Sequence, residues 1–226
     1  MHTMLTIACL LASAAPAAPP PQSRLEITIE QKTPDGWRKA DPATVFASGE
    51  RLRFRVKSNF RGFLYVMNLG TSGAYSLLFP REETGSDNRL EPDREVVVPA
   101  TDGAFTITGP EGYDIIYWMV TPVAVASGQP RPGYVPLPPP PPAGTKLDTL
   151  RPRCDDTIFK ARGECLDREA GPRKVASVEA LPQNLKSVPG LQSRELVFIK
   201  ESGASVVSAP SGLTGPVVYE FRVAHK

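Results

Sequence analysis

The sequence predicts a mainly β fold, an antiparallel, immunoglobulin-like β-sandwich that carries a proline-rich, disulfide-bearing insertion. Apolar or alternating segments recur about every ten residues, which is the spacing of strands in a sandwich or barrel. Residues that favour turns, namely Gly, Pro, Asn and Asp, separate these segments. The chain also holds 25 prolines among its 226 residues. Because proline interrupts helices and central strands, many short elements are expected.

Strand patterns dominate the chain between residues 25 and 120. Segments 25–30 and 51–57 alternate between apolar and polar residues, the period of a strand with one buried face. Segment 62–68 is apolar almost throughout, which predicts a central strand that is covered on both faces. Further strands are expected at 75–80, 95–99, 104–107 and 114–120.

The pattern changes after Pro122. Residues 128–152 are rich in proline, which favours an extended polyproline II conformation. Residues 153–192 contain a cysteine pair, charged residues and weak helical patterns at 157–162 and 175–181. Strand patterns then resume at 195–200 and 217–223.

These patterns predict one sandwich domain over residues 19–226 with an insertion at about 123–193. The insertion is too small and too polar to form a core of its own, so we expect a disulfide to stabilise it. We therefore expect the sandwich to fold without the insertion, which would serve as a recognition surface.

Residues 1–18 have the pattern of a secretory signal peptide. The apolar run from Met4 to Ala12 is too short to cross a bilayer as a helix, and two Ala-x-Ala cleavage patterns follow it. No Lys or Arg precedes the run, which leaves open a weak export signal or a different start codon. A lipoprotein anchored at Cys9 and an uncleaved cytosolic chain are the alternatives. The signal peptide predicts an exported, periplasmic or secreted protein without a transmembrane segment in its mature chain.

Cysteine usage agrees with export. Once Cys9 is removed, only Cys154 and Cys165 remain, and an even pair in an exported chain predicts a disulfide. Free thiols are the main alternative. A zinc site is disfavoured because no histidine lies near the pair to complete the ligand set.

A set of short phrases occurs in the order typical of one bacterial family. The phrases are Phe46-Ala47-Ser48-Gly49-Glu50, Asn59, Gly62-Phe63-Leu64-Tyr65-Val66, Gly73, Leu77-Leu78-Phe79-Pro80, Asn88, Val98-Pro99 and Gly109-Pro110-Glu111-Gly112. Together they make about residues 44–122 resemble domain of unknown function 4384 (DUF4384), and segment 216–225 is compatible with its closing strand. Many of the phrases are turns or strand ends, so they indicate the architecture of the domain more than its chemistry.

The resemblance implies a β-sandwich module of bacterial surface or secreted proteins. Some such domains are attached to caspase-like peptidase or kinase domains, which implies an accessory or interaction role. The family offers no catalytic residues to transfer to this chain. The proline-rich insertion departs from the family pattern.

Few residues are suited to catalysis. The only histidines are His2, which the signal peptide would remove, and His225, next to the C-terminus, so a Ser-His-Asp or Cys-His device is disfavoured. No phosphate-binding Gly-rich loop or zinc-protease motif occurs, and no cofactor or metal is expected. The acid pairs Glu82-Glu83 and Asp155-Asp156 could serve a glycosidase or bind calcium, but adjacent acids in polar loops are more often solvated charge.

Two surfaces could meet a partner. Arg51, Arg53, Arg55 and Lys57 share the polar side of segment 51–57 and could face an anionic polymer or membrane; a solvated strand face or a charge-protected edge strand is the simpler interpretation. The proline run that includes Pro138 and Pro140 could dock into an aromatic groove, or form a stiff loop. In the strand at 114–120, Tyr117 and Trp118 fit core packing better than a sugar-stacking platform.

The sequence therefore favours an exported, non-catalytic interaction module of the bacterial envelope with a protein partner. The alternative is a carboxylate-based glycan-acting hydrolase or carbohydrate-binding domain. The formal net charge of +2 gives no reason to expect nucleic-acid binding.

Overall fold

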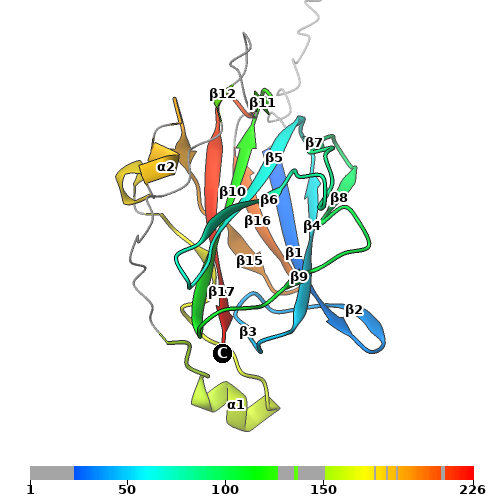
Figure 1. Cartoon of the computed structure of the whole chain (residues 1–226), viewed down its shortest axis with the longest axis vertical. Helices are drawn as coiled ribbons and strands as arrows, with labels where there is room; N and C mark the ends of the chain where they lie inside the picture. Colours follow the sequence, from blue (N-terminus) through cyan, green and yellow to red (C-terminus); the bar gives the residue numbers. More distant parts are fainter. Residues whose placement is uncertain are drawn as a thin grey trace, which may run out of the picture.

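The computed structural model describes residues 23–126, 135–136, 151–175, 177–181, 183–186, 188–209 and 212–226. Within these residues the chain forms two β-sheets that pack against each other in a sandwich-like arrangement (Figure 1). The predicted fold class is confirmed, and Cys154 and Cys165 form the predicted disulfide.

The first sheet has the strand order β15-β16-β1-β4-β8, and β2 and β9 extend it. Its members are β1 (Ser23–Thr33), β2 (Gly36–Lys39), β4 (Arg51–Ser58), β8 (Glu95–Val98), β9 (Phe105–Thr106), β15 (Val197–Ile199) and β16 (Ala204–Ala209). Since β4 pairs with β1 on one side and with β8 and β9 on the other, it is a central strand. The interpretation of segment 51–57 as an edge strand is therefore wrong.

The second sheet has the order β13-β17-β10-β5-β6, and β3, β7 and β14 lie off this path. Its members are β3 (Val45–Phe46), β5 (Gly62–Leu69), β6 (Tyr75–Phe79), β7 (Arg89–Leu90), β10 (Gly112–Thr121), β13 (Gly171–Arg173), β14 (Gln192–Ser193) and β17 (Val217–His225). β17 runs two residues beyond the predicted strand, so that His225 pairs with Gly112 of β10. Two further short strands, β11 (Val125–Ala126) and β12 (Val135–Pro136), pair in parallel.

Among the described residues, helix occurs only in the insertion, as α1 (Asp156–Arg162), a 3-10 turn (Val178–Ala180) and α2 (Gln183–Lys186). The helical pattern at 157–162 is confirmed, whereas the described residues of 175–181 form only the short 3-10 turn. None of these helices has the length and apolar character that a membrane span requires.

The core between the sheets follows the alternation that the sequence predicts. Leu52, Phe54 and Val56 of β4 are buried and share one cluster with inward residues of β5, β10 and β17. The ring of Phe54 meets that of Trp118 edge to face, with centroids 5.0 Å apart, a favoured geometry for aromatic pairs. Trp118 is thus a core residue, as expected.

The outer face of the second sheet is also buried, and the insertion covers it. Val175, Leu181, Leu185, Val188 and Leu191 pack against a group of residues on β5, β10 and β17 that comprises Tyr65, Met67, Tyr117, Met119 and Val218. In Figure 1, α2 accordingly lies beside β17. This confirms that β5 is covered on both faces.

This second core corrects the view of the insertion as an appendage. Its apolar side chains are too few to form a core alone, but the apolar outer face of the sheet supplies the other half. The described residues of segment 175–191 therefore form a layer of the fold. A sandwich deprived of this layer would expose buried tyrosine and methionine side chains to water.

Candidate functional site

The basic side chains of β4 lie on the outer face of the first sheet, where acids meet most of them. Glu30, which is 6% exposed, binds both neighbouring guanidinium groups: Arg53 Nε lies 2.5 Å from Oε2 and Arg55 Nε 2.7 Å from Oε1. Arg55 also pairs with Glu95, and Lys57 Nζ lies 3.9 Å from a carboxylate oxygen of Asp93.

The basic stripe on this face comprises Arg51, Arg53, Arg55 and Lys57. Because acids neutralise most of it, the stripe is poorly suited to bind an anionic surface. Arg53 is further held by its guanidinium, which lies 4.2 Å above the ring of Trp37, a cation–π contact. Arg51, by contrast, is exposed. The solvated strand face remains the better interpretation of the stripe. The other predicted surface, with Pro138 and Pro140, lies outside the described residues.

The disulfide closes a loop at one end of the sandwich. We name residues 154–165, from one cysteine to the other, the stapled loop. Within it, Asp155 caps α1 by accepting hydrogen bonds from the N–H groups of Thr157 and Ile158. Gly163 ends the helix in the left-handed region, with φ 69°, a conformation that favours glycine. The local sequence thus encodes both ends of the helix.

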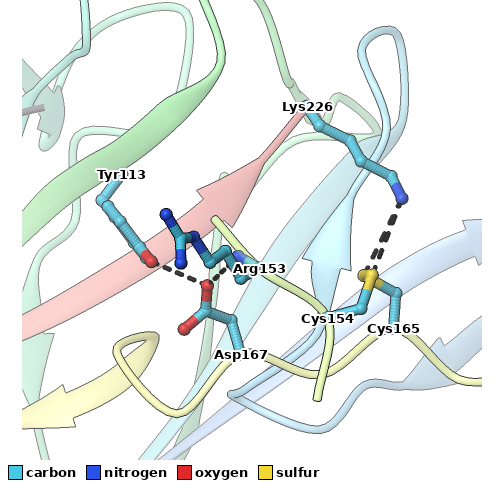
Figure 2. The surroundings of a disulfide bond; sticks show 6 residues. All are labelled: Tyr113, Arg153, Cys154, Cys165, Asp167 and Lys226. Carbon is cyan, nitrogen blue, oxygen red and sulfur yellow. Dashed lines mark hydrogen bonds between the residues drawn. A yellow bond between two sulfur atoms is a disulfide. The ribbon is translucent and has the colours of Figure 1, made fainter. Parts of the chain in front are cut away.

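Asp167 anchors this loop to the sandwich (Figure 2). The side chain is 5% exposed, and its Oδ2 accepts from the hydroxyl of Tyr113 at 2.7 Å and from the N–H of Arg153 at 2.5 Å. Oδ1 accepts from the N–H of Glu169 at 2.7 Å. Burial, together with the bond to Asp167, raises the pKa of Tyr113 well above its ordinary value.

The disulfide itself faces the C-terminal residue. Lys226 Nζ lies 3.9 Å from the sulfur of Cys154 and 3.8 Å from that of Cys165, as Figure 2 shows. Backbone bonds join the same region to the second sheet, since Val45 N–H donates to Cys165 O at 3.0 Å. The base of the stapled loop is therefore fixed to the strands β3 and β10.

The helix of the stapled loop buries none of its residues. Phe159 is 52% exposed, which makes it one of the large apolar side chains left open to solvent. Lys160 and Arg162 follow it in the last turn. In Figure 1, α1 lies below the sandwich and away from both sheets.

A groove of about 320 Å³ separates the stapled loop from the first sheet. Glu164 and Cys165 line it on the loop side, and Arg38, Lys39 and Asp41 line it from β2 and the segment after it. The groove is polar and carries charges of both signs, so it suits a protein surface better than an apolar small molecule.

One acid of each pair considered for catalysis has a structural partner. Asp155 caps α1, and the bonds from Ile158 N–H and Arg168 lower the pKa of its carboxyl. The pKa of the Glu83 carboxyl is lowered by the backbone N–H of Glu83 itself and by the charge of Arg81. A glycosidase acid needs the opposite, a raised pKa that keeps the proton at working pH. In the part of the chain that the structure describes, no group of three His, Cys, Asp or Glu side chains could hold a metal ion.

Three polar residues that the sequence patterns did not single out lie on the inner face of the second sheet. Asn68 shares the inward side of β5 with Leu64 and Val66. Asp114 and His225 likewise lie on the inward sides of β10 and β17. Asn68 and Asp114 line a cavity of about 310 Å³ between the sheets. A signal was present, because a polar residue at an inward position breaks the alternation of each strand.

Comparison with protein families gives one match. Residues 45–124 match the family described as "Domain of unknown function (DUF4384)", which confirms the resemblance drawn from the ordered phrases. No curated protein and no solved structure matches the chain.

Proposed function

We propose that this chain, whose residues 45–124 match the DUF4384 family, is an exported, non-catalytic interaction module of the bacterial envelope that binds a protein partner. The stapled loop is its recognition surface and the sandwich is the support. One observation carries the proposal: several interactions hold α1 in place although it buries none of its residues.

An ordered helix that buries nothing adds little hydrophobic stabilisation. Here a disulfide, an N-cap and the buried Asp167 nevertheless hold the loop in position. The result is a fixed, exposed Phe159 followed by Lys160 and Arg162. Aromatic and arginine side chains of this kind supply much of the binding energy at protein interfaces.

The disulfide also supports export. Such bonds persist in the periplasm and outside the cell, whereas the cytosol keeps thiols reduced. The predicted signal peptide at residues 1–18 agrees with this, although it lies outside the described residues. The alternative, a glycan-acting hydrolase, has less support because Asp155 serves as the N-cap of α1 and Glu83 forms an ion pair with Arg81.

Site-specific photo-crosslinking in cells tests the proposal. A photoreactive phenylalanine analogue replaces Phe159 in the tagged full chain. The matched control places the same analogue at Val197, an exposed apolar residue of β15 that is 60% exposed. Cells are irradiated, and crosslinked species are purified from the envelope fraction and identified by mass spectrometry.

The proposal expects one discrete protein crosslinked from position 159 and absent from position 197. It also expects the protein in the envelope or medium with its N-terminal segment removed. Retention in the cytosol, or the same set of crosslinked proteins from both positions, would contradict it.

A further inference from the structure

The cavity between the sheets has two kinds of wall. Its floor and sides are apolar, with Leu52 and Phe54 from β4, Ile116 from β10 and Val223 from β17. Residues 104–108, the segment around β9, close it on one side. Its volume of about 310 Å³ falls at the lower end of the range for small-molecule sites, roughly 300–1,000 Å³.

Two aromatic rings form part of the apolar wall. The rings of Phe54 and Phe105 lie with their centroids 6.0 Å apart and tilted by 41°. Phe105 is only partly buried, and its neighbours Thr106 and Thr108 are exposed. The segment around β9 therefore offers both an aromatic contact and a route from solvent.

The opposite wall is polar and acidic. Asp114 Oδ1 accepts a 2.9 Å hydrogen bond from the N–H of Thr71 and lies 3.5 Å from Nε2 of His225. Asn68 lines the same cavity from the neighbouring strand, opposite Ile116 in the pairing of β5 with β10. Among the described residues that line the cavity there is no lysine or arginine to neutralise Asp114.

Unsatisfied polar atoms lie on this wall and beside it: Asn68 lines the cavity, whereas Thr71 and His225 lie next to Asp114 without lining it. Asn68 Oδ1, Thr71 Oγ1 and His225 Nε2 are buried and have no hydrogen-bond partner, and His225 is only 1% exposed. Buried polar atoms in folded proteins are almost always paired, since an unpaired one costs free energy. The unpaired Oδ1 of Asn68 and the carboxylate of Asp114 lie on one wall of the cavity and point to a ligand that donates to both.

We propose that this cavity binds a small molecule with an aryl-sized apolar body and a protonated primary amine. The amine donates to the carboxylate of Asp114 and to Oδ1 of Asn68, while the body packs against Phe54 and Phe105. An ammonium group has three donors and no acceptor, which matches a carboxylate and an amide oxygen. The proposal is independent of the stapled loop and of its partner.

Binding of 2-phenylethylamine to the purified mature protein, measured by isothermal titration calorimetry, tests the proposal. The comparison ligands are 2-phenylethanol, which keeps the body and loses the charge, and 3-phenylpropanoate, which reverses the charge. The Asp114→Asn variant keeps an oxygen that can accept from Thr71 N–H, so it should fold. The matched control is Asp93→Asn, because the Asp93 side chain is 87% exposed and does not line the cavity.

We expect saturable binding of the amine at one site and at least about tenfold weaker binding of the alcohol and the acid, the change expected from one lost charge-assisted hydrogen bond. Asp114→Asn should lose about tenfold or more, and Asp93→Asn should match the wild type within about twofold. A second variant, Ala104→Phe, should abolish binding by filling the cavity, without touching its polar wall.

Three outcomes would overturn the proposal. They are no saturable binding of the amine, equal binding of all three ligands, and unchanged affinity in Asp114→Asn. Circular dichroism of each variant establishes that it is folded. If Asp114→Asn is unfolded, the Ala104→Phe variant decides, since unchanged amine binding there places the ligand elsewhere.

Discussion

Tyr113 of β10 donates a 2.7 Å hydrogen bond to the carboxylate of Asp167 in the insertion. The same aspartate accepts from two backbone N–H groups of the insertion, and its own N–H donates to Ala43 O at 2.8 Å. One buried residue therefore joins the sandwich, the segment before β3 and the base of the stapled loop. We expect these parts to unfold together.

Replacement of Asp167 tests this link. Asp167→Ala leaves the Tyr113 hydroxyl and two backbone N–H groups without their acceptor, and each such buried donor costs about 1–3 kcal/mol. We expect the free energy of unfolding, from urea titration, to fall by about 3 kcal/mol or more. Asp93→Asn is the control and should change it by less than about 0.5 kcal/mol. A loss below about 1 kcal/mol for Asp167→Ala would mean that the link is dispensable.

Leu185 tests whether the insertion is a layer of the fold. Its side chain is 0% exposed and lies in the core between the insertion and the outer face of the second sheet, which we call the outer core. Leu185→Ala should therefore cost about 2–5 kcal/mol of unfolding free energy. The neighbouring exposed residue supplies the control, because Lys186→Ala should change stability by less than about 0.5 kcal/mol. Equal urea midpoints for both variants would show that 175–191 is an appendage after all.

The disulfide should stabilise the protein measurably. It joins residues 11 apart in sequence, and closing a loop of this size is worth about 2–3 kcal/mol in the chain-entropy model. A reductant should therefore lower the unfolding free energy of the wild type by about that amount. The double variant Cys154→Ser with Cys165→Ser should be equally destabilised and insensitive to reductant. A wild type that ignores the reductant while its thiols become free would contradict this.

Alkaline pH should destabilise the fold through Tyr219. Burial raises the pKa of this tyrosine to about 12, above the unfolded value of about 10. Below pH 10 the hydroxyl is protonated in both states and its contribution is complete. Between about pH 10 and 12 the unfolded state releases the proton first, so stability falls by about 2–3 kcal/mol as pH rises.

Urea midpoints at pH 9 and pH 11.5 measure this effect. Tyr219→Phe should show a smaller drop between the two pH values than the wild type. A residual drop is expected, since burial also raises the pKa values of Tyr113 and Tyr117. Identical drops in the variant and the wild type would assign the alkaline effect to those other groups.

Much of the sandwich could be predicted from local patterns. The alternation in segment 51–57 places Leu52, Phe54 and Val56 in the inner core, where the structure has them. The continuous apolar run at 62–68 predicts burial on both faces, which the outer core confirms. The pairing of Cys154 with Cys165 followed from a simple count. These features depend on short-range periodicity or on few alternatives.

Other features depend on contacts between distant segments and left weaker signals. β16 was not predicted because only two β-branched residues, Val206 and Val207, stand between alanine and serine residues, and pairing with β1 stabilises the strand. Leu181, Leu185 and Leu191 are separated by prolines that interrupt any long helix, so the segment gave only a weak helical pattern, yet together these residues cover a sheet. His225 was set aside for its place near the C-terminus, whereas β17 carries it into the fold at 1% exposure.

The central claim is that the stapled loop recognises a protein partner while the sandwich supports it. Affinity purification of the tagged protein from the envelope, with Phe159→Asp compared with Val197→Asp, tests this most directly. Both substitutions place a charge at an exposed apolar position, so both variants should stay within about 0.5 kcal/mol of the wild-type stability. The account predicts that the wild type and Val197→Asp recover the same specific protein and that Phe159→Asp loses it. Recovery of that protein by a folded Phe159→Asp variant would contradict the account.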